Sequence, residues 1–188
     1  MSAAVELDGR SRIKRFFFPK IEKRWAPHVF ANIVSVVVIC WVLFFSVVQA
    51  NWHLGIDPQE VKCLPYDYFV IAQKRPEQIV SGRFYRYTAQ GLGAPLKDGT
   101  PLVKIAAAVA GDQVEVNRNG IFINGKKWGD LNRYVLDKTK HTVEGVTRKY
   151  VVGQGEVLLL GTLPRSYDGR YFGPVAIKQV TGRAWPVW

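Results

Sequence analysis

Residues 102–125 read LVKIAAAVAGDQVEVNRNGIFING, and this stretch carries the clearest structural signal in the chain. It opens with an apolar run at 102–109 and continues with an alternation of period two at 113–116. Asn119-Gly120 then separates that alternation from a second run at 121–125. Asn-Gly between such runs is a strong hairpin signal, because a type I′ turn needs positive φ at both central residues. We therefore expect a strand followed by a hairpin that turns at Asn119-Gly120.

Outside this stretch, short apolar segments predict further strands at 68–72, 83–87, 151–152, 156–160 and 175–180. Residues 129–149 are polar and without pattern, which favours a surface excursion. Hydrophobic residues make up 48% of the chain, enough for a real core, and the 17 glycines and ten prolines are spread along its length. The sequence thus predicts a mostly β domain, and we expect one helix only, near the N-terminus.

That helix is expected at 29–50, because no charged residue occurs between Ala31 and Ala50. Twenty residues of helix rise about 30 Å, the thickness of the hydrocarbon core of a bilayer. Residues 1–24 carry seven Lys or Arg against three acids, so the positive-inside rule places the N-terminus in the cytoplasm. The expected organisation is a basic cytoplasmic tail at 1–28, a single-pass anchor at 29–50 and an extracytoplasmic domain at 51–188.

Two other interpretations of the apolar segment compete with an anchor. Val48-Gln49-Ala50 resembles the small-residue cleavage site of a secretory signal peptide, but the apolar run is longer than such signals usually are. A buried core helix is an odd beginning for a soluble domain directly after a basic tail. The length of the run therefore favours an uncleaved anchor in contact with membrane lipid.

The net charge of +11 raises the question of nucleic acid. Four of these charges lie in residues 1–24, and the other seven are scattered without a basic run or a recognisable nucleic-acid motif. A chain of 188 residues has room for one compact domain besides the anchor. We expect no nucleic-acid partner.

Lys104 and Cys63 are the two candidate chemical groups. Lys104 is surrounded by small apolar residues, and desolvation of an ammonium favours the neutral amine, which can accept a proton. The plainer interpretation is a lysine at a strand edge that extends to water. Cys63 is the lone cysteine outside the apolar segment, since Cys40 lies within it. It could be a nucleophile if a base lay nearby, or a small buried hydrophobic residue.

A third cluster lies near the C-terminus, in the sequence Ser166-Tyr-Asp168-Gly-Arg170-Tyr-Phe-Gly173. Asp168 and Arg170 are two positions apart, so they fall on the same side of an extended segment and could pair. An exposed pair of this kind would contribute little to stability or function.

Together the three clusters resemble the type I signal peptidase superfamily and, within it, the TraF-type proteases of conjugative transfer systems. The run from Leu102 to Gly111 with Asp112-Gln-Val resembles the lysine box of that superfamily. Ser166-x-Asp168-x-Arg170-x-x-Gly173 resembles its last box, and Cys63-Leu64-Pro65 matches the placing of the nucleophile two residues before a proline. The resemblance covers residues 30–185.

The resemblance implies a signal-peptidase-like β domain and an endopeptidase in which Lys104 is the general base and Ser166 supports it. Asp168 and Arg170 would form a structural pair, while Leu64, Pro65 and Val103 would contact substrate. The implied substrate is an exported precursor such as a prepilin, cleaved in the periplasm at the inner membrane, with hydrolysis and cyclisation both open. No cofactor or metal is expected.

The nucleophile departs from the resemblance, because the family uses serine where this chain has Cys63. A thiol is easier to deprotonate than a hydroxyl, so a neutral lysine could still activate it. Val61 also stands where the family often has a hydroxyl that assists the oxyanion hole. Two rival hypotheses stay open: a degenerate, membrane-bound assembly factor, and a relative of self-cleaving repressors, which the anchor and the lack of a DNA-binding module disfavour.

Overall fold

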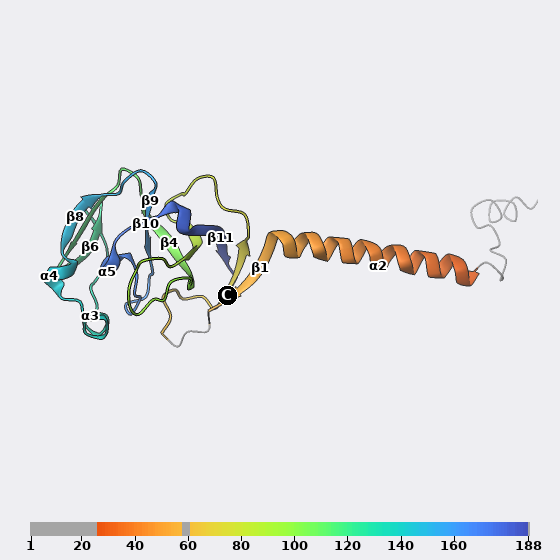
Figure 1. Cartoon of the computed structure of the whole chain (residues 1–188), viewed down its shortest axis with the longest axis horizontal. Helices are drawn as coiled ribbons and strands as arrows, with labels where there is room; N and C mark the ends of the chain where they lie inside the picture. The colour runs from red at the N-terminus through yellow and green to blue at the C-terminus, as the bar shows by residue number, and fades with distance from the viewer. Residues whose placement is uncertain (1–25, 58–60, 188) are drawn as a thin grey trace, which may run out of the picture. The chain divides into compact units, whose positions relative to one another are not determined.

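The computed structural model describes residues 26–57 and 61–187. The chain divides into two compact units, one up to Val47 and the other from Val48 onward (Figure 1). Residues 1–25 of the predicted basic tail lie outside the described residues.

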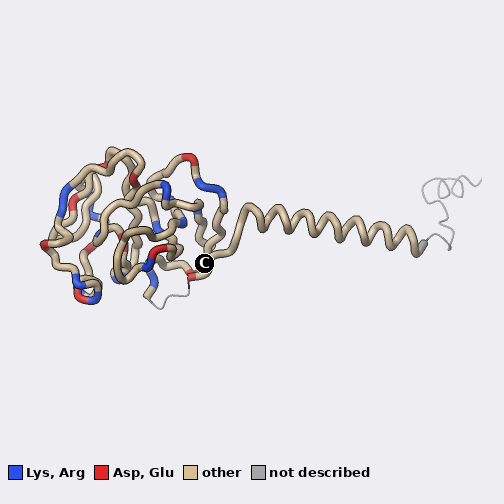
Figure 2. Tube along the Cα trace, in the orientation of Figure 1, with Lys and Arg blue, Asp and Glu red and all other residues tan. Residues whose placement is uncertain are grey.

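Helix α2 (Ala26–Asn51) contains no Lys, Arg, Asp or Glu, and the tube is tan along the helix (Figure 2). Its span from Pro27 to Asn51 is long and apolar enough to cross a membrane, and none of its most apolar window is buried. A helix that is apolar on all sides requires an apolar environment. The helix is therefore a candidate membrane span or signal sequence.

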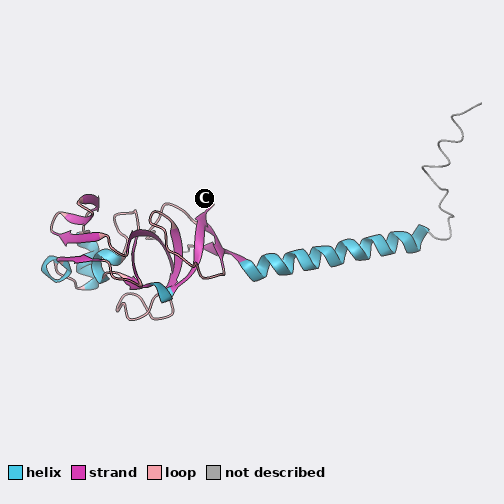
Figure 3. Ribbon diagram, turned by 90° about the horizontal axis from the view of Figure 1, so that it is seen from above, coloured by secondary structure: helices cyan, strands magenta, loops and turns pink. Residues whose placement is uncertain are grey.

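The unit from Val48 onward is mostly β, as predicted, and contains two antiparallel sheets (Figure 3). The larger sheet has the order β1-β2-β11-β3-β4-β9-β10. Its strands are β1 (Trp52–Ile56), β2 (Tyr68–Ala72), β3 (Phe84–Thr88), β4 (Pro101–Val109), β9 (Glu156–Leu160), β10 (Val175–Ala176) and β11 (Val180–Pro186). The smaller sheet has the order β7-β6-β5-β8, with strands β5 (Gln113–Asn117), β6 (Gly120–Ile123), β7 (Lys126–Gly129) and β8 (Arg148–Val151).

Strand β9 joins the two parts of the core, because side chains alternate across a strand. Leu158 and Leu160 pack into the cluster built on the smaller sheet. Val157 and Leu159 pack into the cluster built on the larger sheet, around Tyr85 and Tyr87 of β3. The turn that follows β9 is therefore held between two packed cores, and it carries the candidate site described below.

The hairpin expected at 113–125 is present, but its predicted turn is wrong. Asn117 pairs with Gly120, so the turn lies one residue earlier, and Asn119 does not have positive φ. Gly120 instead adopts φ 120° in β6, where an added Cβ would lie 2.2 Å from the carbonyl oxygen of Gly129. The type I′ pattern belongs to the next Asn-Gly, since Asn124 and Gly125 have φ of 49° and 77° and join β6 to β7.

Two expectations are wrong, the patternless surface excursion at 129–149 and the single helix, because the structure contains three further short helices. Residues 129–149 contain α3 (Arg133–Thr139) and α4 (Val143–Val146), and α5 (Gly169–Phe172) follows β9. The side chains of Asn132 and Thr142 cap the first two helices by accepting backbone N–H groups. Helices of four to seven residues are too short to show a clear apolar period, although Val135, Leu136 and Val146 are buried in the core.

Two further boundaries differ from the prediction. Residues 52–56, which carry no strong strand signal, form β1 and pair with β2. The strand predicted at 175–180 is instead the short β10, a 3₁₀ turn η1 (Ile177–Gln179) and the start of β11. Strand β11 is central in the sheet, and Gly182 allows its backbone to approach closely, since an added Cβ would lie 2.0 Å from the carbonyl oxygen of Ala72.

Candidate active site

Lys104 lies in the middle of β4, and its side chain is 1% exposed. The strand pairs Lys104 with Tyr85 of β3, and the alternation of the strand turns the lysine inward together with Leu102 and Ala106. Its Nζ donates a hydrogen bond to Ser166 Oγ at 2.8 Å, and that serine is fully buried. The structure thus brings the predicted base and the predicted supporting serine into direct contact.

Cys63 is held by the same turn that carries Ser166. Its carbonyl oxygen accepts hydrogen bonds from the backbone N–H groups of Thr162 and Leu163, at 3.1 and 3.2 Å. Gly161 lies between Cys63 and Ser166. An added Cβ at this glycine would be 2.2 Å from Ser166 Oγ and 2.5 Å from the carbonyl oxygen of Cys63. Only glycine fits this approach, so Gly161 fixes the spacing between the cysteine segment and the serine.

Asp168 and Arg170 form a buried ion pair, with side chains 0% and 3% exposed. The aspartate accepts three hydrogen bonds from the arginine, from the backbone N–H, Nε and Nη2, at 3.1, 2.9 and 2.8 Å. It accepts a fourth from the N–H of Gly161 at 2.8 Å. The pairing expected from the sequence is present, but it is buried, and removal of one partner from a buried pair is costly.

The charges around Asp168 set its protonation. Burial alone would raise the pKa of its carboxyl, but the charge and hydrogen bonds of Arg170, the charge of Lys104 in its protonated form and the N–H of Gly161 outweigh that effect and hold the pKa below its usual range. Burial lowers the pKa of Arg170 and the charge of Asp168 raises it, with a net rise. Both groups are therefore ionised at neutral pH, and the pair as a whole is neutral.

Arg170 also ties the Gly161 turn to its surroundings. Its Nη2 donates to the carbonyl oxygen of Gly161 at 3.0 Å, and its Nη1 donates to the carbonyl oxygen of Asp130 at 3.1 Å. Trp128 Nε1 donates to the same Gly161 oxygen at 3.3 Å. Hydrogen bonds to both the N–H and the C=O of Gly161 thus hold the turn that positions Cys63 and Ser166.

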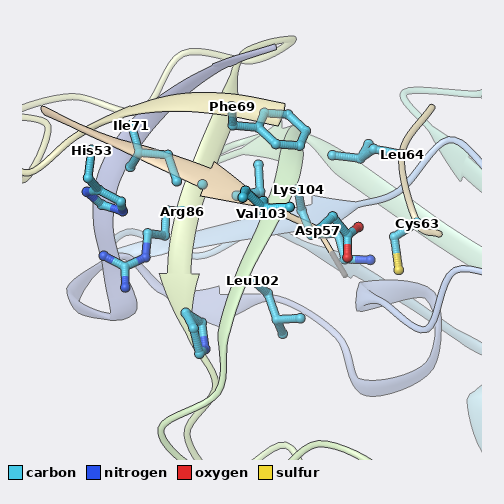
Figure 4. Close-up of a pocket in the computed structure, with 13 residues that line it drawn as sticks. His53, Asp57, Cys63, Leu64, Phe69, Ile71, Arg86, Leu102, Val103 and Lys104 are labelled. Atoms are coloured by element: carbon cyan, nitrogen blue, oxygen red, sulfur yellow. The ribbon is translucent and has the colours of Figure 1, made fainter. Parts of the chain in front are cut away.

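A cavity of about 200 Å³ has both Cys63 and Lys104 in its lining (Figure 4). Cys63 is half-buried, forms no disulfide and lines the cavity. Leu64 and Val103, two of the three predicted substrate contacts, also line the cavity. Pro65, the third, is exposed and is not brought to the cavity.

One edge of β4 is open beside this cavity. Strand β3 pairs with residues 101–105 of β4, and on the opposite edge β9 pairs only with residues 105–109. Among the described strands, none covers the second edge of residues 101–104. Backbone N–H and C=O groups at such an edge can pair with an added extended peptide.

Several residues at the site were missed from the sequence. His53 and Asp57 line the cavity from β1 and its end, a segment for which the sequence predicted no strand. Arg86 lines it too, and the alternation of aromatic and basic residues at 83–87 was an available signal. Burial and then the charge of Arg86 lower the pKa of His53, so its imidazole is mainly neutral at neutral pH. Gly161 directly follows an apolar strand, which marks a turn but not its role.

Comparison with known proteins agrees with this geometry. Residues 23–188 match the model of the family described as signal peptidase, peptidase S26. The chain belongs to this signal peptidase family. The resemblance inferred from the sequence is therefore confirmed at the level of the family.

Two individual proteins are similar to parts of the chain. The chain is 34% identical over 84 residues to plasmid transfer protein TraF of Escherichia coli, a match that covers 42% of this chain and 46% of that protein. The chain thus matches about half the length of this relative. The similarity itself agrees with the TraF-type branch suggested by the sequence. A crystal structure of signal peptidase I from Enterococcus faecalis shares 21% identity over 57% of this chain and 97% of that chain, with a TM-score of 0.36. A likeness at that score adds nothing to the family assignment.

The buried pair makes a stability prediction. Asp168→Asn should lower the free energy of unfolding by about 3–5 kcal/mol at neutral pH, because it leaves the charge of Arg170 buried and unpaired. Since the folded carboxyl has a lowered pKa, its stabilisation is present above the ordinary value of 3.8 and is lost as pH falls through and below it. Urea unfolding of the full chain in detergent, from neutral to acid pH, measures both effects.

The matched control is Asp130→Asn. This aspartate pairs with Lys127 at the surface, with a side chain 78% exposed, so its loss should change stability by less than about 1 kcal/mol. An Asp168→Asn protein as stable as the control, with the acid dependence of the wild type, would contradict the stabilising role given to the pair.

Proposed function

We propose that the chain is a membrane-anchored endopeptidase in which Cys63 is the nucleophile and Lys104 the general base. The observation that carries the proposal is the burial of Lys104 against Ser166 in a cavity whose lining also contains the free thiol of Cys63. The amine of Lys104 donates to a neutral hydroxyl, and the nearby carboxylate of Asp168 is paired with Arg170.

In the proposed reaction the neutral amine of Lys104 takes the thiol proton of Cys63, and the sulfur attacks the scissile carbonyl. The C–N bond breaks as Lys104 returns the proton to the leaving amine, and a thioester remains. A water, deprotonated by Lys104, then attacks the thioester and releases the acid and the thiol. Ser166 orients the amine throughout, and the backbone N–H of Cys63 is the expected oxyanion donor, since Val61 has no hydroxyl to offer.

The proposed substrate is an exported precursor in extended conformation. Its backbone would pair with the open edge of β4 at residues 101–104, and its side chains would enter the cavity against Leu64 and Val103. A cavity of about 200 Å³ favours small or medium apolar side chains before the cut. The similarity to a plasmid transfer protein supports a conjugative pilin as that precursor. Attack on the thioester by an amine of the substrate would give a cyclic product instead of hydrolysis.

The proposed location is the outer face of the inner membrane, with α2 as an uncleaved anchor and the N-terminus in the cytoplasm. The basic residues before α2 support this orientation. Three large apolar side chains of β1, those of Trp52, Leu54 and Ile56, are exposed on one face of the strand. Strand β1 starts directly after α2 ends, so these side chains follow the proposed anchor closely in the sequence and would contact lipid.

A second candidate function is a catalytically inactive assembly factor of a conjugation system. The observations that favour it are Cys63 in the place of the family serine and Val61 in the place of an assisting hydroxyl. A structural cysteine would then hold the Gly161 turn through its backbone alone.

Variants at the dyad separate the two functions. Cys63→Ala and Lys104→Met should each reduce precursor processing by about 100-fold or more, because they remove the nucleophile and the general base. Cys63→Ser should keep part of the activity, since Lys104 remains. Immunoblots of a conjugative prepilin in cells without another such peptidase measure processing. Cys40→Ala and the exposed Lys97→Met are matched controls and should process normally; full processing by Cys63→Ala would support the assembly factor.

The anchor makes a separate prediction. A reporter active only outside the cytoplasm should work when fused after residue 60, and the chain should stay in the membrane at full length, because α2 is long enough to span the bilayer. Membrane fractionation with a C-terminal tag checks both points. A soluble fragment that starts at Asn51 would show that the helix is a cleaved signal.

A further inference from the structure

A second cavity adjoins Cys63. It has a volume of about 230 Å³ and shares two lining residues, Cys63 and Leu102, with the cavity that contains Lys104. The rest of its lining comes from different parts of the chain: Val61, Pro95 and Leu96, helix α3 and the loop after β9. Cys63 thus stands at the boundary between two cavities, and only the first includes Lys104.

Two cations stand at the second cavity, and both contact one aromatic ring. The guanidinium of Arg165 lies 5.1 Å from the centre of the Tyr134 ring, and Lys138 Nζ lies 5.8 Å from the same centre. All three side chains line the cavity and are exposed. Among the described residues, no carboxylate lines this cavity or forms an ion pair with either cation.

The floor of the same cavity is apolar. Leu102 and Val135 are buried there, and the ring of Tyr167 stacks on His141 beside them. The hydroxyl of Tyr167 is within 3.4 Å of both His141 Nε2 and the carbonyl oxygen of Ala94, so the ring is fixed from two sides. An apolar floor below two unpaired cations matches a peptide with an acidic side chain next to an apolar one.

We propose that this second cavity binds the segment that follows the scissile bond, and that Arg165 and Lys138 select an acidic residue in that segment. The inference rests on the proposed function. The acyl part of the substrate takes the cavity with Lys104 and the open edge of β4, and the sulfur of Cys63 joins it there. The leaving amine and the residues after it must then extend to the other side of Cys63, where the second cavity lies.

Quenched fluorescent peptides test this selection with the full chain in detergent. Three peptides share alanines before the bond and differ at one residue after it, which is Glu, Gln or Lys. The wild type should cleave the Glu peptide with a kcat/KM roughly threefold to tenfold above the Gln peptide, the range expected for one or two partly exposed ion pairs, and the Lys peptide should be the poorest. Arg165→Glu should reverse the order, and Lys138→Gln should weaken it.

Arg133→Gln is the matched control, because Arg133 is an exposed cation of the same helix that does not line the cavity. It should keep the order of the wild type. The proposal is overturned if Glu, Gln and Lys peptides are cleaved alike, or if Arg133→Gln changes the order as Arg165→Glu does.

A binding measurement separates this inference from the proposed function. Labelled peptides that contain only the residues after the bond are titrated into the Cys63→Ala protein. They are amidated at the C-terminus, so the acidic side chain of the Glu peptide is its only carboxylate. Fluorescence anisotropy should show tighter binding of the Glu than of the Lys peptide, and reversal of that order in the double variant with Arg165→Glu. This result would stand even if the wild type cleaved no peptide, whereas equal binding would overturn the inference alone.

Discussion

The buried ion pair between Asp168 and Arg170 holds the turn after β9, and this turn positions the rest of the candidate site. Two charges removed from water are costly, and here the cost is offset by hydrogen bonds to both sides of Gly161. The turn in turn holds the carbonyl of Cys63 and the hydroxyl of Ser166. The relative position of Cys63 and Ser166, which are far apart in the sequence, thus depends on the pair of Asp168 and Arg170.

The same pair shapes the electrostatics that Lys104 meets. An isolated buried carboxylate near an amine would favour the ammonium, which cannot accept a proton. Arg170 pairs with Asp168, and Lys104 donates its hydrogen bond to the neutral hydroxyl of Ser166. The proposed chemistry requires this balance, because the lysine must be neutral before the reaction and charged after the first proton transfer.

Much of this could be predicted from the sequence, and the misses have physical causes. The strands at 68–72 and 156–160 were predicted with their boundaries, because short apolar runs between turn residues are local signals. Strand β1 depends on pairing with β2, and helix α3 on tertiary burial of two side chains, so neither had a local pattern. Lys104 stood out through its apolar neighbours. Gly161 did not, since the need for a glycine appears only when distant segments approach it.

The central claim is that Lys104 activates the thiol of Cys63. It is tested most directly by the rate at which iodoacetamide alkylates Cys63, followed by intact mass in a Cys40→Ala background so that one thiol remains. The account predicts that the wild-type site reacts several-fold faster at neutral pH than the Lys104→Met variant, because a lysine that takes the thiol proton raises the share of thiolate. Equal rates in the two proteins, with both folded, would contradict the dyad.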